Sequence, residues 1–147
     1  MRIKFISQKL LITAIAAVAL PLVVQADDKK PRAKVDASKL PPASDKESVT
    51  YTGDIKAILD KSCTKCHGTE KQKGKLRLDS LADTLKGGAD GKVLEPGKSA
   101  ESQLVANIAC IGDEDDWMPP KDNKAKIPQL TPAQIGLIRA WIDQGAK

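Results

Sequence analysis

The densest group of reactive residues in the sequence is Cys63-Thr64-Lys65-Cys66-His67. Its C-x-x-C-H spacing is the attachment sequence of a c-type haem. In such a site the two thiols add to the two vinyl groups of the porphyrin, and the histidine that follows becomes an axial ligand of the iron. Gly68 comes next, and a residue without a side chain suits a chain that leaves close to the porphyrin plane. The motif predicts one covalent haem c held by Cys63, Cys66 and His67, with His67 as an iron ligand.

The cysteine pair has three other interpretations. A thioredoxin-like redox pair requires a strand–helix–strand context, which the sequence pattern does not show. A structural zinc site needs four ligands, whereas the chain has one further cysteine, Cys110, and one histidine in all. A plain disulfide in an exported domain stays open. The adjacent histidine and a methionine downstream favour haem.

The second candidate site is Trp117-Met118-Pro119-Pro120. Met118 is the only methionine beyond residue 26, and a thioether is a soft ligand that suits haem iron. A residue before proline is pushed out of the helical region, so we expect Met118 on an extended segment that two prolines stiffen. If the iron has a second protein ligand, we expect it to be Met118. The alternative is that Met118 fills a gap in the core.

Two short helices are expected around the haem motif. The first is capped by Thr52 and runs to about Ser62, with an apolar face at helical spacing made by Ile55, Ile58 and Leu59. The haem motif then stands at its end. The second helix passes through Leu81 and Leu85, is capped by Asp79 or Ser80, and stops at Gly87-Gly88.

Two further helices are expected in the second half of the chain. One starts at Ser99 or Ser102, ends near residues 110–112, and carries an apolar stripe of Leu104, Val105 and Ile108. The other opens with the capping box Thr131-Pro132-Ala133-Gln134. Its apolar face is formed by Ile135, Leu137, Ile138, Trp141 and Ile142, and Gly145 marks its end. We expect Trp141 to be a core anchor that packs on the first helix.

Residues 1–26 have the pattern of an export signal. Three basic residues precede an apolar run from Leu10 to Val24, and Val24-Gln25-Ala26 forms a small-residue cleavage site. The alternative is an uncleaved membrane anchor, although the run is short for a spanning helix. Covalent haem attachment takes place outside the cytoplasm, so the signal and the motif support the same periplasmic or otherwise exported location.

Composition divides the rest of the chain into a linker and one domain. Residues 27–48 are rich in Lys, Asp, Pro, Ala and Ser, which predicts a flexible polar linker. Residues 49–147 then form the monohaem domain. The chain has a net charge of +5, but residues 27–147 contain 21 basic and 19 acidic residues, a net of +2. This balance, without a basic patch interleaved with aromatic residues, argues against nucleic-acid binding.

Three smaller features carry alternatives. The lysines that follow the haem motif (Lys65, Lys71, Lys73 and Lys75) form either an ordinary solvated loop or a positive rim that steers an acidic redox partner. The acidic run of residues 113–116 is expected to be a solvated loop, because its spacing matches no EF-hand. Cys110 is either an inert, partly buried residue or an exposed thiol that pairs two chains of an otherwise monomeric protein.

The combination of motifs resembles a known family. The relevant segments are residues 63–68, residues 75–85, Glu95-Pro96-Gly97-Lys98-Ser99 before a helix, Met118-Pro119-Pro120-Lys121, and residues 130–131 with 138–146. Together they are similar to the planctomycete-type cytochrome c domain, a branch of the class I cytochrome c superfamily. The resemblance covers about residues 50–146. The stretch between Lys121 and Leu130 departs from it by being longer and more polar, and Cys110 is not part of the pattern.

The resemblance implies a small all-α, cytochrome c-like bundle of about four short helices around one covalent haem. It implies His67 and Met118 as axial ligands and one-electron transfer outside the cytoplasm. The resulting hypothesis is an exported electron carrier between redox partners, not an enzyme, since one histidine leaves no spare imidazole for acid–base work. The alternatives are a haem-based ligand sensor and an electron-transfer subunit docked on a larger redox enzyme.

Overall fold

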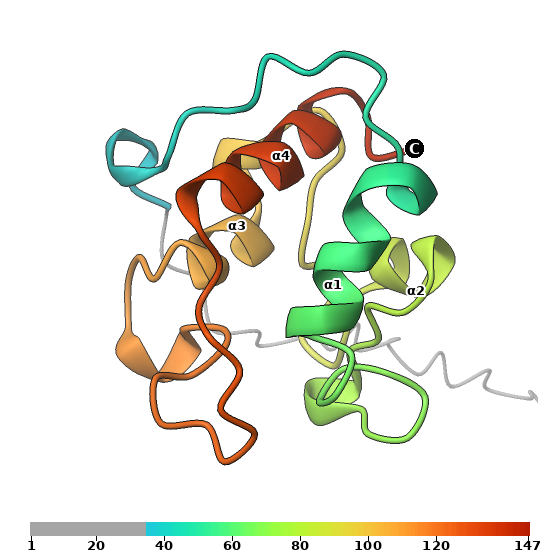
Figure 1. Cartoon of the computed structure of the whole chain (residues 1–147), viewed down its shortest axis with the longest axis vertical. Coiled ribbons are helices and arrows are strands. Elements are labelled where there is room, and N and C mark those ends of the chain that lie inside the picture. The colour runs from blue at the N-terminus through green and yellow to red at the C-terminus, as the bar shows by residue number, and fades with distance from the viewer. Residues whose placement is uncertain (1–34) are drawn as a thin grey trace, which may run out of the picture.

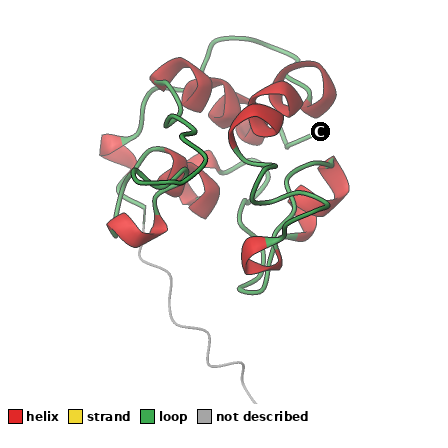
Figure 2. Cartoon of the chain, turned by 60° about the horizontal axis from the view of Figure 1, so that its bottom comes forward, coloured by secondary structure: helices red, strands yellow, loops and turns green. Residues whose placement is uncertain are grey.

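The computed structural model describes residues 35–147 (Figure 1). The predicted signal, residues 1–26, and the first part of the predicted linker lie outside the described residues. Four α-helices follow in order: α1 (Lys56–Ser62), α2 (Leu81–Lys86), α3 (Gln103–Ile108) and α4 (Pro132–Asp143). Over residues 35–147 long loops join these helices, and no strand is present (Figure 2). The predicted all-α fold of about four short helices is confirmed.

The first helix begins two residues earlier than the sequence indicated. Thr50, not Thr52, is the cap, because Thr50 is extended and its hydroxyl accepts a hydrogen bond from the backbone N–H of Gly53. A single π-helical turn, Tyr51–Ile55, then leads directly into α1. Ile55 and Leu59 are fully buried, so the predicted apolar face does point into the core.

Both middle helices lie close to their predicted positions. Ser80 caps α2 by accepting a hydrogen bond from Asp83 N–H, and α2 ends at Gly87, whose φ of +83° favours glycine. A 3₁₀ turn, Ser99–Glu101, precedes α3. The predicted stripe of α3 is buried, with Leu104, Val105 and Ile108 all in the core.

The C-terminal helix α4 organises the core at the end of the molecule opposite the haem motif. Thr131 and Gln134 form the predicted reciprocal capping box. Trp141 is fully buried, its ring centroid lies 5.9 Å from that of Tyr51, and its Nε1 donates to the carbonyl of Lys147. Trp141 therefore anchors α4 to the π turn that leads into α1, as expected for a core residue.

Part of the predicted linker lies on α4. Residues 40–46, here called the N-terminal strap, cross over α4 before the chain reaches α1 (Figure 1). Leu40 is buried, Ser44 N–H donates to the carbonyl of Gly136, and the Arg139 guanidinium donates to the carbonyl of Pro41. The structure thus differs from the expectation of a free linker here. The strap has few apolar side chains, but its backbone polar groups are satisfied by partners on α4.

No helix within residues 35–147 has the length and apolar content needed to cross a membrane.

Candidate functional site

The predicted site residues meet in one cavity. Cys63, Cys66, His67 and Met118 all line it, together with Ser62, Leu76, Leu78, Val93, Leu104, Asn107, Ile108, Pro119, Pro120, Asn123 and Ile127. The empty space is about 680 Å³, a figure that includes the solvent at its open side. In Figure 1 the loop after α1 and the segment after η5 (Glu114–Asp116) lie on opposite sides of the lower half of the molecule.

The haem motif continues α1 as a tight turn. The carbonyl of Leu59 accepts hydrogen bonds from Cys63 N–H and Thr64 N–H, and the carbonyl of Cys63 accepts from Cys66 N–H and His67 N–H. These bonds hold both cysteines and the histidine at the end of a helix whose inner face is buried.

Gly68 is required by this turn for a reason that the sequence did not show. A Cβ on residue 68 would lie 2.4 Å from the carbonyl oxygen of Thr64, much closer than any real contact. We expected the glycine to allow a close approach to the porphyrin. The structure shows that it first allows the motif's own backbone to fold back on itself.

His67 is held in the form that binds metals. Its Nδ1 lies 3.1 Å from the carbonyl oxygen of Lys73, so Nδ1–H donates and Nε2 is left as the lone-pair nitrogen. Burial lowers the pKa of His67 below its ordinary value, because the charged imidazolium is disfavoured away from water. The imidazole is therefore neutral at neutral pH, as ligation requires.

The two thiols of the motif differ in environment. Cys63 is buried, and burial raises the pKa of its thiol to about 12. Cys66 is half-buried, and neither cysteine is in a disulfide. Both cysteines line the cavity as free thiols, which are the reactants that addition to a vinyl group consumes.

Met118 is positioned by α3. Its backbone N–H donates to the carbonyl of Asn107 over 3.0 Å, which ties the segment after η5 to the end of α3. Asn107 also lines the cavity, and its Oδ1 accepts from Gln103 Nε2 over 2.6 Å. Sequence reasoning missed Asn107. The sequence feature that could have identified Asn107 is its position in the helix. It is a polar residue three positions after Leu104 and directly before Ile108, on the helix face that these two apolar residues occupy.

A second asparagine shapes the loop that departs from the family pattern. Asn123 Nδ2 donates to the carbonyls of Pro120 and Ile127, and its Oδ1 accepts from Ile127 N–H, each over 2.8 Å. One side chain therefore closes the loop that follows Met118. This places Ile127 in the cavity wall beside Pro119 and Pro120.

The neighbours of Met118 complete this side of the molecule. Lys121 Nζ lies 4.4 Å from the ring centroid of Trp117 and 2.8 Å from Glu114 Oε1. Trp117 Nε1 is buried and has no hydrogen-bond partner within residues 35–147.

Cys110 follows α3 in a left-handed conformation and is half-buried. Burial raises the pKa of its thiol, which lowers the reactivity of a cysteine.

The residues fit a haem. The walls are mostly aliphatic side chains and proline, which match a porphyrin, and the nitrogen and sulfur donors come from two separate segments. A zinc site would need a cluster of cysteine, histidine or carboxylate side chains. Residues 35–147 contain no group of three such side chains placed to hold a metal ion.

Comparison with known proteins finds a family match over the segment that contains the haem motif and Met118. Residues 63–122 match the family model described as planctomycete cytochrome C, which runs from the first cysteine of the haem motif to just beyond Met118. The searches of curated proteins and of solved structures found no match. The match implies covalently bound haem c. Over residues 63–122 the chain is thus similar to a planctomycete-type cytochrome c domain.

Proposed function

We propose that the protein is an exported monohaem cytochrome that carries single electrons between redox partners, with His67 and Met118 as the iron ligands. The observation that carries the proposal is the cavity that Cys63, Cys66, His67 and Met118 line together. Bound haem supplies one-electron chemistry at its iron, and the protein supplies attachment, ligands and access.

Each of these residues has a distinct task. Cys63 and Cys66 provide the thiols for two thioether bonds. The carbonyl of Lys73 orients His67 so that Nε2 faces the cavity, and α3 holds Met118 through the backbone of Asn107. The apolar side chains of the wall would limit the access of water to His67 and Met118 when they hold the iron.

Electron carriage is favoured over catalysis by the donor set. Domains of this class typically carry electrons. The chain contains one histidine, so once His67 is a ligand no imidazole remains for proton transfer on the other side of the haem. Export is supported by residues 1–26 and by the extracytoplasmic location typical of such domains.

The optical spectrum of the purified, exported protein tests the proposal. We expect a low-spin c-type spectrum and, in the oxidised protein, the weak near-infrared band that reports sulfur on ferric haem. Met118→Ala should lose that band, bind carbon monoxide when reduced, and have a lower reduction potential. The control Ile127→Ala also shortens a side chain of the cavity wall and should keep the band.

Two results would contradict specific parts of the proposal. Persistence of the near-infrared band in Met118→Ala would exclude Met118 as the ligand. Tight carbon monoxide binding by the unmodified reduced protein at neutral pH would instead favour the ligand sensor. Absence of haem, in a host able to attach it, would refute the proposal as a whole.

A further inference from the structure

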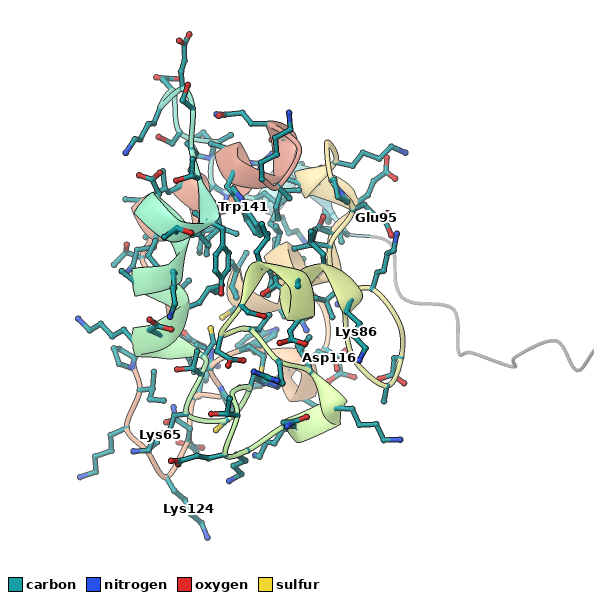
Figure 3. All side chains as sticks on the ribbon, turned by 90° about the vertical axis from the view of Figure 1, so that its right-hand side faces the viewer. Lys65, Lys86, Glu95, Asp116, Lys124 and Trp141 are labelled. Atoms are coloured by element: carbon teal, nitrogen blue, oxygen red, sulfur yellow. The ribbon has the colours of Figure 1, made fainter. Side chains whose placement is uncertain are left out.

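The cavity lies at the end of the molecule where the haem motif and the loop after Met118 come together. Figure 3 shows Lys65, within the haem motif, and Lys124, in that loop, at this end and far from Trp141. The wall is completed by α3, which contributes the half-buried side chain of Asn107. Asn107 is therefore a polar group on a wall made mostly of aliphatic side chains and proline.

The orientation of the Asn107 amide is set by Gln103, one helical turn earlier. Gln103 Nε2 donates to Asn107 Oδ1 over 2.6 Å, a pairing typical of side chains at positions i and i+4 of a helix. An amide carries its acceptor and its donors on opposite arms, so this bond turns Asn107 Nδ2 away from Gln103. Within residues 35–147 Nδ2 makes no hydrogen bond. It is thus a free donor on the cavity wall.

The other side-chain nitrogens among the lining residues are already engaged. His67 Nδ1 donates to the carbonyl of Lys73, and Nε2 is the proposed iron donor. Asn123 Nδ2 donates to two backbone carbonyls, and its Oδ1 accepts from Ile127 N–H. Asn123 therefore uses its amide to close a loop, whereas Asn107 keeps a donor for the cavity.

A free amide donor at this place needs a partner once the cavity is filled. A bound haem displaces water from the wall, and a polar group that loses water without gaining a hydrogen bond destabilises the protein. The partner must be an acceptor that lies within reach of the amide when the haem is bound.

Asn107 and Met118 are joined through the main chain. The carbonyl of Asn107 lies in the last turn of α3, where helix carbonyls lack partners further along the helix. This carbonyl accepts from Cys110 N–H over 3.2 Å and from Met118 N–H over 3.0 Å. Both side chains line the same cavity. The bond to the main chain thus keeps the Met118 side chain beside the free donor.

We propose that Asn107 is a positioning residue for the iron ligand Met118, with Nδ2 donating a hydrogen bond to the Met118 sulfur. The proposal rests on the proposed function, since it requires Met118 on the iron. A thioether sulfur is a weak acceptor, but here the main-chain bond holds it close to the donor. The hydrogen bond restricts the orientation of the sulfur and draws electron density from it, which favours the reduced iron.

The near-infrared band of the oxidised protein reports on the sulfur directly. Asn107→Leu keeps the backbone carbonyl that holds Met118 N–H and a side chain of similar size, but it removes the donor. The band should persist and move to longer wavelength, because a sulfur without a hydrogen-bond donor gives electron density to ferric iron more readily. The reduction potential should fall for the same reason. A side chain that merely filled space would leave the band in place.

Displacement of Met118 by added imidazole measures how firmly the sulfur is held. The affinity of the oxidised protein for imidazole should rise about fivefold in Asn107→Leu, the factor that corresponds to one net hydrogen bond. Imidazole is neutral and replaces a neutral thioether, so this competition responds little to a change in surface charge.

Gln103→Glu tests the orientation of the amide from outside the cavity wall. An ionised carboxylate only accepts hydrogen bonds, so Asn107 must turn its amide to donate to it, and Oδ1 then replaces Nδ2 at the cavity. The band and the imidazole affinity should change in the same direction as in Asn107→Leu. This variant alters no lining residue, so it tests the proposal even if Asn107→Leu fails to attach haem.

Gln129→Glu is the matched control for the added charge. It makes the same chemical change at an exposed residue that does not line the cavity. The band should stay in place, and the imidazole affinity should change by less than about twofold, because exposed charges interact weakly.

Several outcomes would overturn the positioning role. An unmoved band in either Asn107→Leu or Gln103→Glu, with normal haem content, would refute it and leave the proposed function intact. An equal shift in Gln129→Glu would also refute it, because charge alone would then explain the shift. If Asn107→Leu changed the pH dependence of the potential while the band stayed in place, the amide would belong to a haem carboxylate. A missing band in the unmodified, haem-loaded protein would instead refute the ligation in the proposed function, before any variant was made.

Discussion

Gly136 lies in contact with the N-terminal strap, since its carbonyl accepts from Ser44 N–H, which makes Gly136→Ala a sharp test of the strap. A Cβ at this position would lie 2.6 Å from the carbonyl oxygen of Pro42. The backbone of the strap would have to move, and such overpacking costs about 1–3 kcal/mol. Alanine in a helix interior stabilises the helix by about 1 kcal/mol relative to glycine. The net expectation is a loss of stability of about 0–2 kcal/mol.

The same substitution should have the opposite effect once the strap is absent. In a chain that lacks residues 27–45, the overlap with Pro42 disappears and the helix propensity remains. Gly136→Ala should then stabilise the protein by about 1 kcal/mol. The difference between the two backgrounds, about 1–3 kcal/mol, is the coupling between the strap and α4.

Guanidinium unfolding of the haem-loaded protein, followed by far-ultraviolet circular dichroism, measures both values. Ala133→Gly is the control, since Ala133 is an exposed residue of α4 and its substitution should cost the same in both backgrounds. If Gly136→Ala gave the same change in both backgrounds to within about 0.5 kcal/mol, the strap would not lie on α4 as described.

Three further predictions concern the core and the haem motif. The hydroxyl of Tyr51 donates to the carbonyl of Leu78, and burial raises the pKa of Tyr51 above its ordinary value. As pH rises, the unfolded chain therefore loses this proton before the folded protein does. The free energy of unfolding should then fall as pH rises above about 10. Tyr51→Phe should cost about 1 kcal/mol at pH 7 and flatten that alkaline loss in denaturant titrations; an unchanged slope would contradict the assignment. Gly68→Ala should reduce the yield of haem-loaded protein severalfold, measured by haem absorbance per polypeptide, because its Cβ meets the carbonyl of Thr64; a normal yield would show that the turn can relax. A variant with alanine at both cysteines of the Cys63–His67 motif, lacking haem, should show no cooperative thermal transition, because a small core is incomplete without the cofactor; a melt close to that of the parent would refute this.

The sequence by itself determined the features that depend on neighbours along the chain. The C-x-x-C-H spacing and the capping box at Thr131 are local covalent or hydrogen-bonding patterns, complete within a few residues. The cap of α2 was likewise narrowed to Asp79 or Ser80, of which the structure uses Ser80. The apolar stripes of α1, α3 and α4 likewise follow from helical periodicity. The haem motif and the Met118-Pro119 segment also identified Cys63, Cys66, His67 and Met118 as candidate residues of one site.

The tertiary structure decided what depends on partners far apart in the chain. Thr50 competes with Thr52 for the same helix start, and the choice follows from which residue the incoming chain holds extended. The bond between Asn107 and Met118 joins residues on separate segments, and no periodic pattern encodes it. The strap is polar in composition, yet carbonyl and guanidinium groups of α4 satisfy its backbone. Burial and hydrogen bonding at such sites depend on which surfaces meet, and composition along the chain does not specify that.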